Sequence, residues 1–417
     1  MARRALTSMT AVLAALLAGS LLAACSAAAE HPTPRPTASP AARVTPTSAT
    51  TTAPTASASP STPAPAPTPA GGPVPAGFVP VAGAALPAGV IWLLGTAPCG
   101  SAPCTSIVRS LDGGVHWAGI PAPRAPLASA AGATGVSRIE FATALDGWAY
   151  GPQLWSTDDG GARWHALTPL PGGVIGAAVT GDGLVVALSV SGGGAVDLAR
   201  VSASDTLTVT HTVAGASSGQ LASSPDGSVW FAAAPPPGGG STAVLESGDG
   251  GSTWAARTPP CSGSWALGAP SLASPGPDRV VAVCAGSGAA GSQLKRVMAS
   301  ADGGSTWSTA FVTTTPPPGR GIESGDLGPV AAAGSQVVLG TSSGASNLFV
   351  SASAGTAWTA ATGYNPQTGG TPWTTLAFAG SGQALAVTAG AVSPQRWSGA
   401  AYLSADGGAT WRALSPR

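Results

Sequence analysis

An eight-residue motif recurs along the chain and constrains its fold more than any other feature. The segment Ser-Ala-Asp-Gly-Gly-Ala-Thr-Trp at 404–411 has relatives of the form S/T-x-D-x-G-x-x-W, which we call the box motif. The copies start, in chain order, at Ser110, Thr157, Ser247, Ser300, Ser351 and Ser404. The copy at 351–358 carries Ser353 where the others carry Asp. A motif repeated this often indicates a repeat architecture.

The spacing of the copies sets the number of repeats. Successive starts are separated by 47, 90, 53, 51 and 53 residues, and 90 is twice 45. A degenerate copy is therefore expected near 202, where Ser202 is present but the Gly and the Trp are missing. Seven repeats of this length are typical of a β-propeller with one four-stranded sheet per repeat. The sequence predicts an all-β fold, a seven-bladed β-propeller of antiparallel blades.

Short Val-rich runs separated by Gly-rich turns supply the strands, and no stretch has helical periodicity. Strands are expected at 78–81, 90–95, 106–110 and 117–120 in the first repeat and at 137–142, 147–151, 153–157 and 164–167 in the second. In the seventh repeat they are expected at 373–378, 384–388, 400–404 and 411–414. Each of these repeats holds its own four strands, which leaves open how the ring closes.

The N-terminal segment has the pattern of an exported protein. Residues 1–25 combine Arg3 and Arg4 with a short apolar stretch and end in Leu-Ala-Ala-Cys, which resembles the lipobox of bacterial lipoproteins. The resemblance implies a lipid on Cys25 and attachment to the outer face of the cytoplasmic membrane; an ordinary cleaved signal peptide is the alternative. Residues 26–75 are rich in Pro, Thr, Ser and Ala and predict a disordered linker, so that the propeller occupies 76–417.

The amino-acid composition limits the classes of partner that we expect this chain to bind. Charged residues make up 8% of the chain, the net charge is zero and Lys295 is the one lysine, so no basic patch for nucleic acid is expected.

Four cysteines remain once Cys25 is set aside, namely Cys99, Cys104, Cys261 and Cys284. An even number in an exported chain favours two disulfides, Cys99–Cys104 across a tight loop and Cys261–Cys284 as the remaining pair. A metal site is the disfavoured alternative, since no His is spaced near these cysteines; no metal or cofactor is predicted.

The box motif resembles the Asp-box (BNR) repeat of sialidases, sortilin-type receptors, some xyloglucan hydrolases and photosystem assembly factors. In such a turn the carboxylate accepts hydrogen bonds from its own backbone, and Gly supplies positive φ. We interpret the acids as turn staples rather than as a catalytic or calcium-binding ring. They are Asp112, Asp159, Asp249, Asp302 and Asp406. The tryptophans that begin the fourth strands are Trp117, Trp164, Trp254, Trp307, Trp358 and Trp411.

The sialidase resemblance does not extend to catalytic residues. The Arg-Ile-Pro element of that family is missing, and Arg138-Ile139-Glu140 in the second repeat is followed by Phe141. No residue matches the arginine triad or the Tyr–Glu pair, so no catalytic residue is predicted. The segment 146–151, followed by the box at 157–164, resembles instead the photosystem-assembly-factor branch.

Ligand sites in propellers gather on one face, and the face away from the box turns is the one expected here. Ordinary solvent-exposed loops without a ligand are the alternative for this face. Its predicted ligand residues are Arg320, Glu323, Asp326, Tyr364, Arg396 and Trp397. The sequence thus predicts a monomeric, membrane-anchored and surface-displayed binding or assembly module for a protein or glycan partner. An exported glycoside hydrolase of sialidase-like type is the alternative.

Overall fold

The structure is a computed structural model that describes residues 71–100, 102–128, 134–181, 183–190, 194–234, 243–313, 321–366, 371–380, 382–393 and 396–417. By its internal contacts the chain divides into Met1–Pro63 and Ala64–Arg417, and every described residue belongs to the second unit. The predicted signal peptide with Cys25, the linker up to residue 70, and Arg320 lie outside the described residues.

Seven sheets make up the described unit, each built from four consecutive antiparallel strands. The first sheet consists of β1 (Val79–Leu86), β2 (Val90–Cys99), β3 (Ala102–Ser110) and β4 (Ala118–Ile120). The second consists of β5 (Arg138–Phe141), β6 (Gly147–Tyr150), β7 (Leu154–Thr157) and β8 (His165–Ala166). The third consists of β9 (Gly172–Thr180), β10 (Gly183–Val190), β11 (Ala195–Ser202) and β12 (Leu207–Ala214). The last four are β13 (Gly219–Ser223), β14 (Val229–Ala233), β15 (Val244–Ser247), β16 (Ala255–Arg257); β17 (Ser271–Gly276), β18 (Arg279–Ala289), β19 (Ser292–Ser300), β20 (Ser308–Val312); β21 (Asp326–Ala333), β22 (Gln336–Ser343), β23 (Ala345–Ser351), β24 (Thr359–Ala360); and β25 (Trp373–Phe378), β26 (Ala384–Ser393), β27 (Arg396–Ser404), β28 (Arg412–Leu414). Two short 3-10 turns, η1 (Pro87–Gly89) and η2 (Gly263–Trp265), accompany them.

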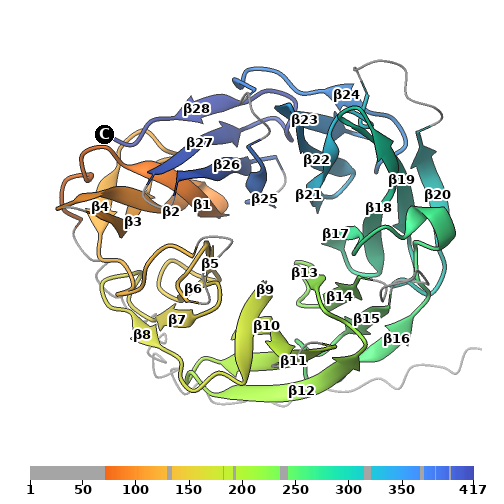
Figure 1. Cartoon of the computed structure of the whole chain (residues 1–417), viewed down its shortest axis with the longest axis horizontal. Helices are drawn as coiled ribbons and strands as arrows, with labels where there is room; N and C mark the ends of the chain where they lie inside the picture. The colour runs from red at the N-terminus through yellow and green to blue at the C-terminus, as the bar shows by residue number, and fades with distance from the viewer. Residues whose placement is uncertain are drawn as a thin grey trace, which may run out of the picture. The chain divides into compact units, whose positions relative to one another are not determined.

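The sheets stand side by side around a common axis, with the first strand of each sheet innermost (Figure 1). This arrangement is a seven-bladed β-propeller, which confirms the predicted fold class. The third blade, whose box motif is degenerate, turns at 203–206 between β11 and β12, where the interval of 90 residues places it. The strand ends in the second repeat agree with the prediction to within one residue.

The ring closes without an exchanged strand, because β1 to β4 form the first sheet and β25 to β28 the last. Side chains join the two blades instead. Thr374 donates its hydroxyl to the carbonyl of Val81 at 2.5 Å, and the Gly83 amide donates to the Thr375 hydroxyl at 3.1 Å. A buried apolar cluster packs Ile91 and neighbouring residues of β2 against β26 and β27. Closure therefore rests on side-chain packing and a few polar contacts.

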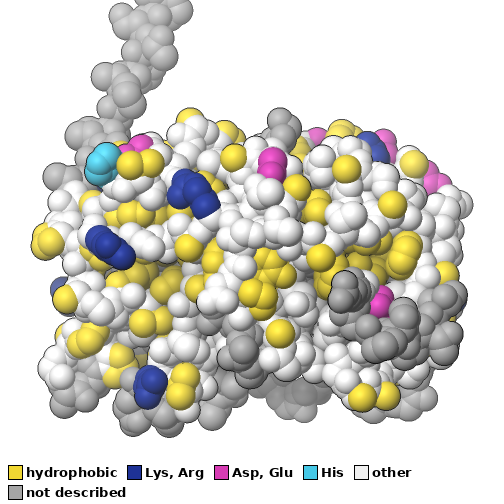
Figure 2. All heavy atoms as spheres, turned by 90° about the horizontal axis from the view of Figure 1, so that it is seen from above, with side chains coloured by type: hydrophobic (Ala, Val, Ile, Leu, Met, Phe, Trp, Pro, Cys, Tyr) yellow, Lys and Arg dark blue, Asp and Glu magenta, His cyan; other side chains and the backbone are white. Residues whose placement is uncertain are grey.

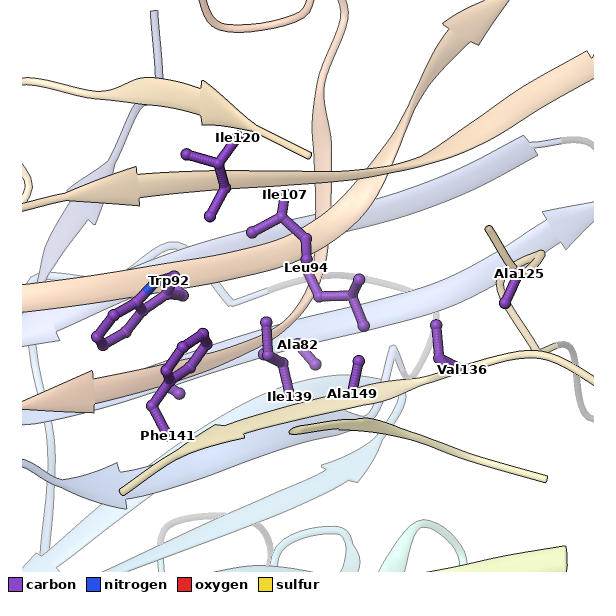
Figure 3. Packing of buried hydrophobic residues seen from close by; sticks show 11 residues of the cluster. Ala82, Trp92, Leu94, Ile107, Ile120, Ala125, Val136, Ile139, Phe141 and Ala149 are labelled. Carbon is purple, nitrogen blue, oxygen red and sulfur yellow. The ribbon is translucent and has the colours of Figure 1, made fainter. Parts of the chain in front are cut away.

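Apolar side chains fill the spaces between adjacent blades. Between blades 1 and 2, Ala82, Trp92 and Leu94 face Ile139 and Phe141 (Figure 3). The rings of Trp92 and Phe141 are stacked, with 3.8 Å between centroids and 6° between planes. Strands with Val, Ile and aromatic residues on both faces suit this position, since both faces of each blade are covered by its neighbours.

The box turns all lie between the third and fourth strands of their blades, and their carboxylates bind their own backbone. In the last one, Asp406 accepts hydrogen bonds from the Thr410 amide at 2.9 Å and the Thr410 hydroxyl at 2.6 Å. The Ser404 hydroxyl donates to the same carboxylate and accepts from the Gly408 amide. Gly408 has φ of +95°, and a Cβ there would stand 2.3 Å from Val338 of the preceding blade. These contacts hold the backbone of the turn.

The degenerate turns keep part of this pattern. Ser353, in place of Asp, accepts from the Ala357 amide at 3.2 Å, so a hydroxyl preserves one of the backbone bonds. In the third blade the Ser202 hydroxyl accepts from the Thr206 amide at 3.2 Å. Each degenerate turn therefore keeps one hydrogen bond from a backbone amide to a serine hydroxyl, although the turn of the third blade is shorter, since β12 begins at Leu207.

The box tryptophans use their indole N–H groups in two ways. Those of Trp117, Trp358 and Trp411 donate to a carbonyl of their own turn. Those of Trp164, Trp254 and Trp307 reach the preceding blade and donate to Pro121, Thr210 and Thr258 respectively. Half of these residues thus hold a turn, and half tie two blades together.

Both predicted disulfides are present. Cys99–Cys104 joins β2 to β3, and this hairpin extends beyond the predicted strands at 90–95 and 106–110. Cys261–Cys284 joins the segment between blades 4 and 5 to β18, and both cysteines are buried. Among the residues that the structure describes, no helix has the length and apolar character that crossing a membrane requires.

Residues 71–75, which the sequence prediction assigns to the linker, are the first residues that the structure describes. Gly72 and Gly119 exchange backbone hydrogen bonds of 2.8 and 2.9 Å at the outer edge of blade 1. Residues 71–75 therefore already lie against the propeller.

Candidate functional site

A cavity of about 680 Å³ lies on the propeller axis. Its lining comes from the ends of all seven innermost strands, β1, β5, β9, β13, β17, β21 and β25, and from the turns that follow them. The first and third strands of a blade run in the same direction, so these turns share a face with the box turns. The cavity therefore opens on the face that carries the box turns, which we call the box face.

The wall of the cavity is apolar and offers backbone groups. Its side chains are mostly Ala, Leu, Val and Phe, and each innermost strand pairs on one edge with the second strand of its blade. The other edge, with its N–H and C=O groups, is turned towards the axis (Figure 1). Such edges can pair with an extended chain. Ser224 adds a hydroxyl that is buried, at 7% exposure, and has no hydrogen-bond partner in the described structure.

Glu140 is the one ionisable residue among the described residues that line the cavity. It lies on β5 opposite Trp148 and keeps partial access to solvent. Burial raises the pKa of Glu140 from 4.5 to about 7, and the positive charge of Arg138 acts in the opposite direction. Burial also raises the pKa of Tyr150, with a further contribution from the charge of Glu140. The cavity thus holds a carboxyl group that changes its charge near neutral pH.

Replacing Glu140 by Gln should change the pH dependence of folding. A pKa that is higher in the folded than in the unfolded chain stabilises the fold fully below pH 4.5, and this contribution is lost as the pH rises through 7. Glu140→Gln has no charge to bury, so we expect it to match the wild type at pH 4 and to exceed its stability at pH 8. The expected increase in the free energy of unfolding at pH 8 is at most ~3 kcal/mol. Urea unfolding at the two pH values measures it, and equal stabilities at pH 8 would contradict the burial of Glu140.

The predicted ligand residues that the structure describes do not line the cavity. Arg320 lies outside the described residues. Glu323 is buried at 6% exposure and accepts a hydrogen bond from the Gly321 amide at 3.0 Å. Asp326 is exposed, and both acids lie near the buried Lys295, whose ammonium donates to the carbonyl of Gly325 at 2.7 Å. Burial lowers the pKa of Lys295 to about 8, against the effect of the two acids. Here the structure shows a polar cluster that ties blade 5 to the segment before β21.

Tyr364 is packed between blades 6 and 7, whereas Arg396 and Trp397 lie at the start of β27, on the face away from the box turns. The Tyr364 hydroxyl accepts from the Leu348 amide at 2.9 Å, and its ring packs edge-on against Trp373 and Tyr402. Arg396 is exposed and Trp397 half-buried at the start of β27. Tyr364 has a structural role, and a ligand at this face stays a prediction.

The sequence predicts that Glu140 lies in the first strand of the second repeat, at 137–142, but does not place it in a ligand site. The sequence did contain one signal for this placement, because Glu140 is an acid inside a predicted first strand rather than in a turn. What the sequence lacked is the width of the channel, which depends on how the seven blades tilt against one another.

Comparison with known proteins supports the fold. No protein-family model matches the sequence, and no curated protein does. Among solved structures, a puromycin hydrolase has 14% identity and a TM-score of 0.53 over 81% of this chain and 54% of its own. A puromycin-hydrolyzing peptidase of Mycobacterium tuberculosis has 15% identity and a TM-score of 0.52 over 82% of this chain and 53% of its own. YCF48 bound to D1 peptide has 17% identity and a TM-score of 0.48 over 81% of this chain and 94% of its own.

The similarities to the two hydrolases, at 14% and 15% identity, show the β-propeller fold alone. The chain spans about half the length of the two hydrolases and nearly the whole of YCF48.

Proposed function

We propose that this propeller is a non-catalytic binding module that takes an extended segment of a protein partner into the cavity on the box face. The observation that carries the proposal is the cavity itself, with its unpaired innermost strand edges and apolar wall. Backbone N–H and C=O groups on a strand edge favour a polypeptide over a glycan, because an added strand satisfies them in register. The small side chains leave room for a main chain to approach.

Filling the cavity tests this function. Ala377 lines the cavity on β25 and is half-buried, whereas Ala255 is exposed on the outer strand β16. A phage-displayed library of 12-residue peptides, selected on the full-length chain, supplies the probes. We expect Ala377→Trp to lower the affinity of selected peptides at least about tenfold and Ala255→Trp to leave it unchanged. Peptides that bind both variants as tightly as the wild type would refute a channel site.

A glycoside hydrolase is the second candidate, and one observation favours it. A carboxyl group with a pKa of about 7 suits a general acid at neutral pH. A glycosidase of the usual kind needs a second carboxylate about 5–10 Å away, and the described cavity lining has Glu140 alone. Turnover of a panel of fluorogenic glycosides, including a sialoside, that is abolished by Glu140→Gln would favour the enzyme over the binding module.

We further propose that the module is lipid-anchored through Cys25 on the outer face of the cytoplasmic membrane. The support is the sequence pattern that ends in Leu-Ala-Ala-Cys. We expect Cys25→Ala to move the protein from the membrane to the soluble fraction on cell fractionation. Unchanged membrane retention would count against the anchor.

A further inference from the structure

Acidic side chains are concentrated on the box face. Ten aspartates of the described residues lie in turns on this face. They are Asp112, Asp146, Asp158, Asp159, Asp205, Asp226, Asp249, Asp278, Asp302 and Asp406. Four arginines reach the same face, namely Arg163, Arg200, Arg279 and Arg412. Figure 2 shows most of the visible Asp and Glu side chains along one rim of the molecule.

Hydrogen bonds within the box turns keep the box aspartates charged at physiological pH. Hydrogen bonds from the backbone and side chain of Thr253 lower the pKa of Asp249 to about 2. The hydroxyl and amide of Thr306 do the same for Asp302. Since the chain as a whole has no net charge, the box face is negative relative to the rest of the molecule.

The cavity at the centre of this face provides the second, independent observation. Among the described residues of its lining, Glu140 is the one that ionises. The Ser224 hydroxyl, also in the lining, is more than nine-tenths buried and lacks a hydrogen-bond partner in the described structure. Arg138 and Tyr150 are the other titratable groups that act on Glu140. Arg138 lies two residues earlier on β5, about 7 Å further from the mouth.

We infer that the partner segment is basic: an extended polypeptide with Arg or Lys side chains, one of which enters the cavity towards Glu140 while its flanks pass over the aspartate turns. This inference rests on the proposed function and specifies its partner. A cation in the cavity compensates the carboxylate of Glu140. The ring of aspartates accelerates encounter and makes the affinity depend on salt.

Three labelled 12-residue peptides test the inference on the full-length chain by fluorescence anisotropy. They share a Ser/Ala background and carry four Arg, four Gln or four Glu at the same positions. We expect the Arg peptide to bind about tenfold or more tightly than the Gln peptide and the Glu peptide not to bind. Raising NaCl from 50 to 300 mM should weaken the Arg peptide at least about fivefold.

Substitutions of single acidic residues show which carboxylates bind the Arg peptide. We expect Glu140→Gln to weaken the Arg peptide about tenfold, because it leaves the entering cation without its counter-charge. Asp226→Asn and Asp278→Asn, each in an exposed turn of the box face, should each weaken it about twofold and reduce the salt dependence. Asp197→Asn is the matched control on β11, outside the box-face turns, and should change nothing.

The outcomes separate this inference from the proposed function. If the Arg and Gln peptides bind equally well, and Ala377→Trp weakens both, the channel is a binding site but its partner is not basic. Preference for the Glu peptide overturns the inference as well. If no peptide of any charge binds the folded chain, both the inference and the proposed function fail.

Discussion

Trp92→Ala should be among the most destabilising single substitutions in this propeller. Trp92 on β2 is fully buried, and its ring stacks on Phe141 of the next blade. Removing a buried Trp leaves a cavity that rigid sheets on both sides cannot close, at a cost of ~3–5 kcal/mol. Urea unfolding followed by far-ultraviolet circular dichroism measures the loss.

Two further variants make the Trp92 prediction specific. The Trp92 indole N–H is buried without a partner in the described structure, so Trp92→Phe removes an unsatisfied donor while it keeps a ring against Phe141. We expect it to cost about 1 kcal/mol or less. Trp397→Ala, at the half-buried start of β27, should cost a similarly small amount. Equal unfolding midpoints for Trp92→Ala and Trp397→Ala would contradict the packing between blades 1 and 2.

The sequence could predict the architecture because the box motif is a local structure. Ser404, Asp406 and Gly408 bind one another within a single turn, so the motif can be recognised without its neighbours. Its regular spacing then counts the blades, and the same spacing locates the degenerate turn at Ser202. The two disulfides follow from cysteine number and loop size in the same way.

Contacts between blades could not be predicted, because they depend on how sheets far apart in sequence pack. The indole of Trp307 donates to Thr258 in the preceding blade, whereas that of Trp411 donates within its own turn, although the two motifs differ at one position. The same limit applies to the candidate site. The position of Glu140 in the axial cavity follows from the relative placement of seven innermost strands, and no local motif records that placement.

Removing the Cys261–Cys284 disulfide is the second change for which we expect a large effect. Its cysteines are 23 residues apart and buried, and they tie the segment between blades 4 and 5 to β18. The chain-entropy relation for a closed loop of that length gives a stabilisation of ~3.5 kcal/mol. The double variant Cys261→Ala/Cys284→Ala avoids a buried free thiol, and its unfolding midpoint in urea should fall accordingly.

The other disulfide provides the matched control. Cys99 and Cys104 are 5 residues apart and close the β2–β3 hairpin, where Cys99 is exposed. A loop this short restricts the unfolded chain less, so the same relation gives a stabilisation of ~2 kcal/mol. In addition, backbone pairing between β2 and β3 already holds the hairpin together. Cys99→Ala/Cys104→Ala should therefore destabilise the propeller less than the buried pair does. The reverse order would show that hairpin geometry, rather than the loop between blades, limits the stability of the ring.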